Sequence, residues 1–552
     1  MAATDRVTAW GLRSVPADLR ARYLADGSWT DDTFASYLDH RAATAPDLRV
    51  RIWSDERPCT TTVADLHGQA ARVAGGLATR GVGPGDVIAY QMPNWAETLA
   101  VIWAGFRLGA TVVPIIHFYG PDEVRFIVRQ SGARVLVTPP AFGGVDHLAN
   151  LAAVRADLDV LETVVVAGTP DEARRVPGGV TLADLAAAAP LTEPAPVDPD
   201  APAMVGYTSG TTADPKGVVH SHRTLLAEVR QLAALQQSRN RPAVMAAPLA
   251  HMTGMLGGSL VPVHNGAAIE LIDRWDPGRV LAIAAEHDVN PGGGATIFLT
   301  SLLDHPDFGP EHLAVMPHFG LGGAPVPHAV ADRAEALGIR VTRAYGSTEH
   351  PSITGSSPDA PAAKRTRTDG CALPGVELRL VDEDGDDVPT GAPGEIMSRG
   401  PDLFVGYTDP ALTAAAVDAD GWYRTGDVGV LDDDGYLTIT DRLSDIIIRG
   451  GRNLSASEIE QRVTTMPAVA EVAVVAAPDP RLGERACAVV RLAPGAGSEA
   501  VTLEAVQAHL AASGLAKQKW AEEVRVVEAF DRTPSGKIRK RTLRDALRAE
   551  AT

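Results

Sequence analysis

Residues 87–115 read VIAYQMPNWAETLAVIWAGFRLGATVVPI, and the order of elements in this stretch decides the fold class. The short apolar run Val87–Tyr90 has the length and composition of a buried strand. A helical segment, Trp95–Leu108, follows it, and a second strand-like run occupies Thr111–Ile115. A strand, a helix and a strand in this order predict a parallel pair joined by a crossover helix.

The segments on either side continue this alternation. Upstream, apolar residues recur at steps of three and four from Val63 to Leu77, which marks one face of an amphipathic helix. Downstream, the apolar run Val135–Val137 predicts a further strand. We therefore expect an α/β architecture in which helices pack on largely parallel sheets.

Composition divides the rest of the chain. Residues 187–203, AAAPLTEPAPVDPDAPA, are rich in proline and predict a linker or surface loop. Beyond about residue 372, short β-like runs alternate with acidic glycine turns such as DEDGDD, which predicts a small antiparallel or barrel-like unit. From Asp445 onward, strand-like and helix-like segments alternate again over enough residues for an independent domain.

The chain has 552 residues, a formal net charge of −19 and three widely spaced cysteines. Its length predicts more than one hydrophobic core. So acidic a surface repels nucleic-acid phosphate and anionic lipid, so neither is expected as a general partner. The charged N-terminus argues against a signal peptide, and no segment has the uncharged length of a membrane span. An odd number of distant cysteines predicts reduced thiols, and we expect a cytoplasmic protein.

Residues 207–217, YTSGTTADPKG, concentrate hydroxyl groups, glycine and lysine. Such a loop suits phosphate, because glycine lets the backbone approach, N–H and hydroxyl groups donate to the oxygens, and lysine supplies positive charge. The GxxxxGK[ST] spacing of the common P-loop is absent. Taken alone, the stretch fits a flexible surface turn equally well.

Five motifs in order give the chain a resemblance to a known family: YTSGTTADPKG, YGSTEH, GWYRTGDVG, DRLSDIIIRGGRN and RTPSGKIRK. They resemble the acyl-adenylate-forming superfamily of acyl-CoA synthetases, peptide-synthetase adenylation domains and luciferases, from roughly residue 35 to 545. The resemblance implies a large N-terminal domain of several subdomains (1–441), with sheets flanked by helices and a small β-barrel-like unit. A hinge (442–445) and a small mobile α+β C-terminal domain (446–552) would follow. It also implies ATP, Mg²⁺ and coenzyme A as cosubstrates.

The resemblance assigns a role to each motif residue. The residues expected over the β- and γ-phosphates of ATP are Thr208, Ser209, Gly210, Thr211, Thr212 and Lys216. Those expected around adenine and the nearby nucleotide are Gly322, Gly323, Ala324, Pro325, Tyr345, Gly346 and Ser347, with Tyr345 flat against the purine. Thr348 and Glu349 would meet the α-phosphate and Mg²⁺, because carboxylate and phosphate oxygens suit this hard cation.

Asp427 would accept both ribose hydroxyls, and Arg442 would approach the ribose or the phosphates from the domain junction. Two simpler interpretations stay open at this point. Glu349 could be a solvated surface carboxylate, and Asp427 could serve an Asx-turn after Gly426.

Lys537, near the C-terminus, would be the catalytic lysine. When the substrate carboxylate attacks the α-phosphorus two anions meet, and a desolvated ammonium between them lowers the barrier. The acid is already ionised at neutral pH, so this half-reaction needs no general base. The neighbouring Arg539, Lys540 and Arg541 are expected to form a solvated basic patch; a dock for an anionic partner is the alternative.

By its position in the family pattern, His251 would lie near the substrate carboxylate or the pantetheine channel, although a purely structural role is equally open. Gly294 and Gly320 would leave room for a bulky apolar acid. Peptide-synthetase domains carry an aspartate in this region to pair with an amino acid's ammonium, and the run PLAHMTGMLGG has none. The sequence therefore argues against amino-acid substrates.

After adenylation the C-terminal domain of such enzymes rotates about a hinge, here Ser444, and brings Gly450 and Gly451 to the coenzyme A tunnel. The sequence departs from the family pattern at Ala213, Ser444 and Arg452. The departures at the hinge and after the glycine pair make the second half-reaction the less secure of the two.

The sequence thus predicts an AMP-forming acid:CoA ligase. A close alternative is adenylation alone, with acyl-AMP passed to a carrier protein or partner enzyme. A non-catalytic nucleotide-binding regulator is more remote, because such proteins tend to lose the lysine that is present here as Lys537. A luciferase-like oxidation and a homo-oligomeric assembly also stay open.

Overall fold

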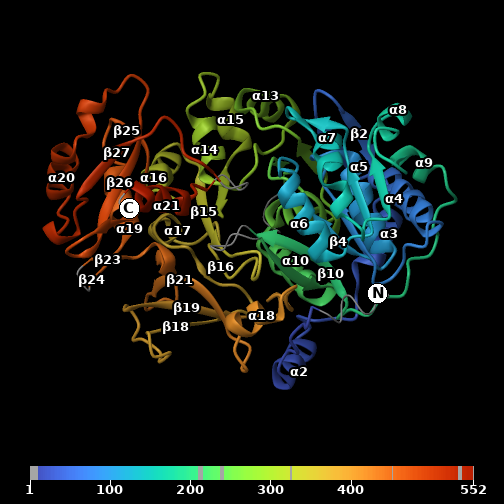
Figure 1. Cartoon of the computed structure of the whole chain (residues 1–552), viewed down its shortest axis with the longest axis horizontal. Coiled ribbons are helices and arrows are strands. Elements are labelled where there is room, and N and C mark those ends of the chain that lie inside the picture. Colours follow the sequence, from blue (N-terminus) through green and yellow to red (C-terminus); the bar gives the residue numbers. More distant parts are fainter. Residues whose placement is uncertain are drawn as a thin grey trace.

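The structure is a computed structural model that describes residues 10–208, 215–236, 241–323, 326–449, 452–532 and 537–550. Figure 1 shows the first half of the chain as layered sheets and helices at one end and the last hundred residues as a separate body at the other. Strands β18 (Glu377–Val381), β19 (Pro393–Arg399) and β21 (Tyr423–Leu431) lie below the junction between these two parts.

The largest sheet has eight strands. In spatial order they are β20 (Gly406–Tyr407), β11 (Lys216–Ser221), β10 (Pro202–Thr208), β4 (Thr111–Pro114), β3 (Val87–Tyr90), β5 (Val135–Thr138), β8 (Thr163–Val166) and β9 (Val180–Thr181). The six strands from β10 to β9 are parallel, and β11 and β20 add antiparallel pairs at one edge. The prediction of a largely parallel sheet is confirmed.

The helices predicted around this sheet form close to their expected bounds. Helix α4 (Val63–Ala78) begins after Thr62, whose hydroxyl accepts the Asp65 N–H while the Asp65 carboxylate accepts the Thr62 N–H. This reciprocal pair satisfies backbone groups that the first turn leaves unpaired. Helix α5 (Ala96–Arg107) is buried all round except at Glu97, because it packs between the sheet and helices α3 (Phe34–Thr44) and α4.

Two smaller sheets complete the layered part. The first contains β12 (Val244–Met245), β13 (Ile269–Ile272), β1 (Arg49–Trp53) and β2 (Cys59–Thr62). The second contains β14 (His318–Gly322), β15 (Arg340–Tyr345), β16 (Thr354–Gly355) and β17 (Cys371–Ala372). The other helices around the sheets include α6 (Pro121–Ser131), α10 (His222–Gln236), α13 (Pro277–His287), α14 (Thr296–Leu303) and α16 (His328–Ala336).

The antiparallel unit expected beyond residue 372 is present. Its strands are β18 (Glu377–Val381), β19 (Pro393–Arg399), β21 (Tyr423–Leu431) and β22 (Leu437–Arg442), and every pairing is antiparallel. A single bridge between Cys371 and Tyr436 joins this sheet to β17. The unit is therefore a separate sheet that touches the sheet of β15 at its edge.

The C-terminal part has its own sheet and core. Its strands are β23 (Ile447–Arg449), β24 (Arg452–Leu454), β25 (Val469–Asp479), β26 (Gly483–Leu492) and β27 (Glu523–Val526), with helices α19 (Ala456–Val463), α20 (Leu503–Ala512) and α21 (Lys540–Glu550). One buried cluster draws all its members from residues 447–521. A separate core supports the proposed domain that begins near residue 446. Among all the helices described, none is both long enough and apolar enough to cross a bilayer.

The proline-rich stretch 187–203 is a surface segment, but it is fastened to the core. Nearly buried Arg107 donates from its guanidinium to the Leu191 carbonyl at 2.5 Å, and its own carbonyl accepts the Ala195 N–H at 2.8 Å. The stretch also passes so close to α4 that a Cβ added at Gly75 would lie 1.9 Å from the Ala189 carbonyl oxygen. Part of the predicted loop, residues 189–195, is thus packed against α4 and Arg107, and we call it the strap. The last two residues of the stretch begin β10.

Two glycines of α4 give a matched test of this packing. Gly75→Ala should lower the free energy of unfolding by about 1–3 kcal/mol, because the new methyl group meets backbone atoms. Gly68→Ala should raise it by about 0.5–1 kcal/mol, because its nearest neighbour is the Arg72 side chain at 3.7 Å and alanine favours the helix. Thermal denaturation of both variants measures the difference, and equal melting temperatures would show that the strap is loose.

Candidate active site

A cleft of about 2640 Å³ lies between the layered part, the antiparallel unit and the C-terminal part. All the predicted site residues that the structure describes line it: Thr208, Lys216, His251, Gly294, Gly320, Gly322, Gly323, Tyr345, Gly346, Ser347, Thr348, Glu349, Asp427, Arg442, Ser444 and Lys537. The others lie outside the described residues: Ser209, Gly210, Thr211, Thr212, Ala324, Pro325, Gly450 and Gly451. The cleft therefore gathers residues from all five sequence motifs.

The two described ends of the phosphate-loop motif meet at the cleft. Thr208 is the last residue of β10 and pairs with Lys216, the first residue of β11. The Lys216 ammonium lies 5.5 Å from the centre of the Tyr407 ring, a cation–π contact that holds the charge inside the cleft. Strand pairing thus brings a hydroxyl and an ammonium together where phosphate is expected.

The segment Tyr345–Ser352 makes a tight turn at the end of β15. A Cβ at Gly346 would lie 2.0 Å from the Pro351 carbonyl oxygen, so only glycine fits this turn. The Thr348 carbonyl lies 2.7 Å from Nε2 of His220. Burial lowers the pKa of His220 to about 4, so the neutral ring donates from Nε2 to that carbonyl. These contacts fix the backbone on both sides of Glu349.

Glu349 is buried at the edge of the cleft, with 8% of its surface exposed, so its interpretation as a solvated surface carboxylate is wrong. The Tyr407 hydroxyl donates to Oε1 at 2.8 Å, and this leaves Oε2 for a metal ion. A buried carboxylate with one oxygen held by a neutral donor and the other left for a ligand at the edge of the cleft fits Mg²⁺.

Asp427, on β21, joins two other elements. The Tyr345 hydroxyl donates to Oδ2 at 2.7 Å, and Arg442 Nε donates to Oδ1 at 2.7 Å. The carboxylate is therefore used in tertiary contacts and not in an Asx-turn. An ionised carboxylate has about four acceptor positions, so two remain for hydroxyl groups of a ligand.

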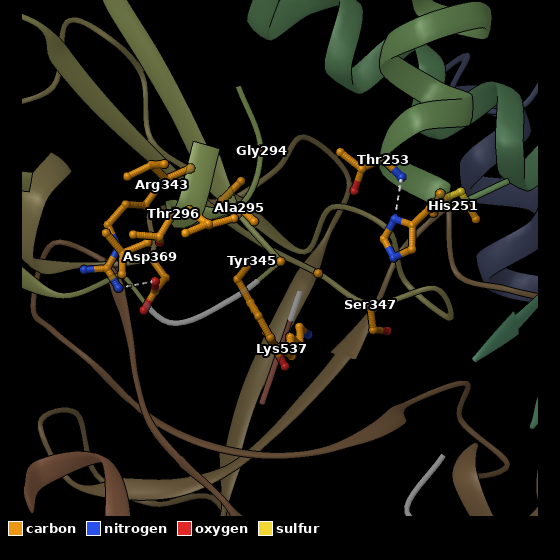
Figure 2. A pocket seen from close by; sticks show the side chains of 18 of the residues that line it. His251, Thr253, Gly294, Ala295, Thr296, Arg343, Tyr345, Ser347, Asp369 and Lys537 are labelled. Atoms are coloured by element: carbon orange, nitrogen blue, oxygen red, sulfur yellow. Dashed lines mark hydrogen bonds and ion pairs between the residues drawn. The ribbon is translucent and has the colours of Figure 1, made fainter. Parts of the chain in front are cut away.

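Lys537 enters the same cleft from the C-terminal part. Figure 2 shows Lys537 and Tyr345 in the middle of the view, with His251 on one side and Arg343 and Asp369 on the other. Burial, and then the charge of Arg442, lower the pKa of Lys537 to about 8, and the charges of Asp427 and Glu349 oppose this shift. The ammonium is thus desolvated and close to the predicted metal and ribose residues.

His251 caps helix α11 (Met252–Met255), where its Nδ1 accepts the Thr253 N–H at 3.3 Å. Burial, and then the charge of Lys537, lower its pKa to about 4, so the ring is neutral. A neutral ring with Nδ1 engaged carries its proton on Nε2, which can donate to a ligand in the cleft. The structural role and the cleft-facing position of His251 therefore coexist (Figure 2).

A π-helix, η2 (Leu256–Leu260), continues directly from α11. Such helices are rare and frequently occur at functional sites. Gly257 within it faces Met245 on β12, and both line the cleft. A Cβ at Gly257 would lie 2.5 Å from the Met245 methyl group, so this wall is shaped by a glycine opposite a flexible side chain.

The glycine-rich segment Gly292–Gly294 runs along the edge of β14. Gly294 N–H donates to the Gly320 carbonyl at 2.9 Å, and Gly322 N–H donates to the Gly294 carbonyl at 3.0 Å. The backbone of this segment itself forms a wall of the cleft, with little side-chain volume.

The sequence did not indicate several residues at the site. Arg343 and Asp369 form a buried ion pair at 2.7 Å beside the expected adenine region (Figure 2). Tyr407 and His220 hold Glu349 and Thr348 from strands distant in sequence. No local pattern marks these four residues, because each acts through a long-range contact.

The hinge region and the basic residues after Lys537 lie together. Ser444 is in the short helix η3 (Leu443–Asp445), and Arg544 of α21 donates to its carbonyl at 2.8 Å. Lys540 forms an ion pair with Glu460 at 2.8 Å and is largely covered, so its assignment to a solvated patch is wrong. Arg541 is exposed, as that prediction requires, whereas Arg539 is half-buried and donates to the Arg532 carbonyl at 3.0 Å.

Comparisons with known proteins agree with this geometry. The AMP-binding enzyme family matches residues 38–408, and the AMP-binding enzyme C-terminal domain matches residues 458–537. The medium-chain fatty-acid–CoA ligase of Escherichia coli (strain K12) is 34% identical over 97% of this chain and 94% of its own. A 3-[(3aS,4S,7aS)-7a-methyl-1,5-dioxo-octahydro-1H-inden-4-yl]propanoyl:CoA ligase of Rhodococcus jostii (strain RHA1) is 34% identical over 88% and 93%.

Among solved structures, ATP-bound MatB from Rhodopseudomonas palustris is similar, with a TM-score of 0.83 and 29% identity. The match covers 94% of this chain and all of that one. The expected fold, the five motifs and these similarities agree over nearly the whole length. The chain belongs to the AMP-binding enzyme family and, within it, to the acyl-CoA synthetases of the adenylate-forming superfamily, whose cosubstrates are ATP, Mg²⁺ and coenzyme A.

Proposed function

We propose that this chain activates an apolar carboxylic acid that is not an amino acid, and that it transfers the acyl group to coenzyme A through acyl-AMP. The desolvated Lys537 ammonium, in one cleft with Glu349 and Asp427, is the observation that carries this proposal. A cation buried among nucleotide-binding residues suits a reaction in which two anions must meet.

In the first half-reaction a carboxylate oxygen of the acid attacks the α-phosphorus of ATP. An oxygen–phosphorus bond forms, the bond to the β-phosphate bridge breaks, and pyrophosphate leaves with the electron pair. Lys537 stabilises the charge that develops between the two anions, and Asp427 holds the ribose. Thr208 and Lys216, with the loop between these two residues, bind the β- and γ-phosphates.

Mg²⁺, held by Glu349 and phosphate oxygens, would neutralise charge on the departing pyrophosphate. The chain's own contribution is to fix Glu349, through the Tyr407 hydroxyl on Oε1 and the His220 ring on the preceding carbonyl. Both donors are neutral, so they orient the carboxylate without reducing its attraction for the metal.

In the second half-reaction the coenzyme A thiol attacks the acyl carbon, the thioester bond forms, and AMP leaves together with a proton. For this step we propose that the domain from residue 446 rotates about Ser444, withdraws Lys537 and brings Gly450 and Gly451 to the acyl group. Adenylation alone, with transfer to a carrier protein or partner enzyme, is the alternative that the experiment below distinguishes.

The acid is proposed to be apolar because of the wall around His251. Residues 244–258, VMAAPLAHMTGMLGG, contain no acidic side chain that could pair with the ammonium of an amino acid. Relatives named for a medium-chain fatty acid and for a fused-ring propanoic acid support this class. We also place the enzyme in the cytoplasm, where ATP and coenzyme A are available and its three free thiols persist.

A two-stage assay tests the proposed function. Purified protein is given MgATP and a panel of aliphatic, aromatic, alicyclic and amino acids, and pyrophosphate release is measured without coenzyme A. Coenzyme A is then added, and acyl-CoA is sought by mass spectrometry. We expect apolar acids to give both products, whereas acyl-AMP that coenzyme A never consumes would favour the transfer alternative. Activity with amino acids alone would contradict the proposal.

The pKa of Lys537 predicts a pH dependence. The ammonium form is the active one, so kcat/KM for adenylation should fall as the pH rises through about 8. The fall in kcat should come at higher pH, because bound phosphates stabilise the ammonium. Lys537→Ala should reduce acyl-AMP formation ~10²–10³-fold. Lys537→Arg, which stays charged, should lose the fall near pH 8, and an unchanged profile in that variant would assign the titration to another group.

The glycine opposite Met245 predicts a change in acid preference. Gly257→Leu should place a bulky side chain in the cleft beside His251 and shift kcat/KM toward shorter acids in a straight-chain series. For the longest acids that the wild type accepts, kcat/KM should fall about tenfold for each one or two carbons that no longer fit. Gly257→Ala should change little, because only the flexible Met245 methyl group must move. An unaltered preference in the leucine variant, with normal ATP binding, would show that the acyl tail runs elsewhere.

A further inference from the structure

Behind the segment Tyr345–Ser352 lies a buried polar cluster that the reaction as described does not use. Its members come from four parts of the chain and are each at most 7% exposed: Glu228, His350, Ser352, Ser398 and Asp402. We call this group the carboxyl cluster. Burying two carboxyl groups in a core is costly unless their oxygens are satisfied, so the cluster needs a physical explanation.

The hydrogen bonds of the carboxyl cluster leave one oxygen of each acid unaccounted for. Ser352 donates its hydroxyl to Glu228 Oε1 at 2.6 Å, and His350 Nε2 lies 3.2 Å from Asp402 Oδ1. Glu228 Oε2 and Asp402 Oδ2 are buried and have no donor among the described residues. The two carboxyl groups are close enough to each other for a hydrogen bond once one of them carries a proton.

Ionised carboxylates can only accept hydrogen bonds, so a bond between two carboxyl groups requires a proton on one of them. Burial, and then the charge of Asp402, raise the pKa of Glu228 well above its usual range. Glu228 is therefore the acid that holds the proton and donates it to Asp402. Asp402 Oδ1 in turn lies beside Nε2 of the His350 ring.

The carboxyl cluster is attached to Glu349 at three points. His350 follows Glu349 directly, and its Nδ1 lies 2.8 Å from the Ser398 hydroxyl. The Phe404 N–H, two residues after Asp402, donates to the Glu349 carbonyl at 2.8 Å. Ser352 ends the turn and is bound to Glu228. A shift of either acid would therefore move the backbone that carries Glu349.

We propose that Glu228 and Asp402 share one proton, and that this pair is a positioning device which holds Glu349, through Ser352 and His350, in the orientation that binds the metal. The positioning part of this inference rests on the proposed role of Glu349 as the Mg²⁺ ligand, whereas the shared proton does not. The pair acts through other residues and does not itself touch the reactants.

Two substitutions of similar volume separate positioning from packing. In Glu228→Gln the amide N–H replaces the shared proton and the amide oxygen still accepts from Ser352, so adenylation and its Mg²⁺ requirement should stay within about threefold of the wild type. In Glu228→Met both hydrogen bonds are lost, and the Mg²⁺ concentration for half-maximal rate should rise about tenfold or more. Circular dichroism and ATP affinity measured in EDTA serve as controls, and both should be unchanged.

Equal Mg²⁺ requirements in the two variants would overturn the positioning role. If Glu228→Met fails to fold, the glutamine variant still decides. A tenfold rise in the Mg²⁺ concentration for half-maximal rate in Glu228→Gln, which keeps both hydrogen bonds, would also overturn the positioning role. Glu349→Gln run in parallel identifies a failure of the proposed metal ligand: an unchanged Mg²⁺ requirement in that variant removes the role of Glu349 itself.

Infrared spectroscopy tests the shared proton without any activity. At neutral pH the wild type should have a carbonyl-stretch band of a buried protonated carboxylic acid that shifts in heavy water, and Glu228→Gln should lose it. Presence of the same band in the glutamine variant, or its absence from the wild type, would show that the two acids do not share a proton. A small cation between two ionised carboxylates would then be the explanation of their contact.

Discussion

The carboxylate of Asp427 joins the elements on which the whole site is built. It lies on β21 and binds Tyr345 at the end of β15 and Arg442 at the end of β22. Arg442 is half exposed, whereas the Tyr345 hydroxyl is buried and has Asp427 as its acceptor. Leaving such a buried hydroxyl without its acceptor typically costs about 1–3 kcal/mol. The expected adenine wall, the ribose position and the start of the hinge therefore depend on one another through this single side chain.

The same ion pair also acts on Lys537. Burial lowers the pKa of the ammonium most, Arg442 lowers it further, and Asp427 and Glu349 oppose this shift. A desolvated cation in a low-dielectric cleft interacts strongly with charge that appears later, on the reacting phosphate and carboxylate. We therefore expect Lys537 to interact more strongly with the transition state than with the cleft before substrates bind.

Patterns of neighbouring residues in the sequence predicted individual helices and strands. The run Val87–Tyr90 forms β3 within its predicted bounds, and the helical segment Trp95–Leu108 forms α5 to within one residue at each end. Several motif residues converge because they end strands, as Thr208, Tyr345 and Arg442 do. Contacts such as Tyr407 on Glu349, or Glu228 on Asp402, depend on how distant strands and helices pack, and no periodicity encodes them. Lys540 was assigned to solvent for the same reason, since only the packing of α21 brings Glu460 to it.

The proposed hinge has a physical boundary on each side. On one side, Arg442 is held by Asp427 of the antiparallel unit. On the other, the Ser444 carbonyl and the Asp445 carboxylate are both held by Arg544 of α21, the helix that begins three residues after Lys537. Leu443 lies between these anchors with 47% of its surface exposed. Rotation is therefore least hindered at the backbone bonds between Arg442 and Ser444, and the residues on the C-terminal side, Lys537 among them, would move with α21 as one unit. A serine at position 444 suffices, because its backbone and not its side chain is what Arg544 holds.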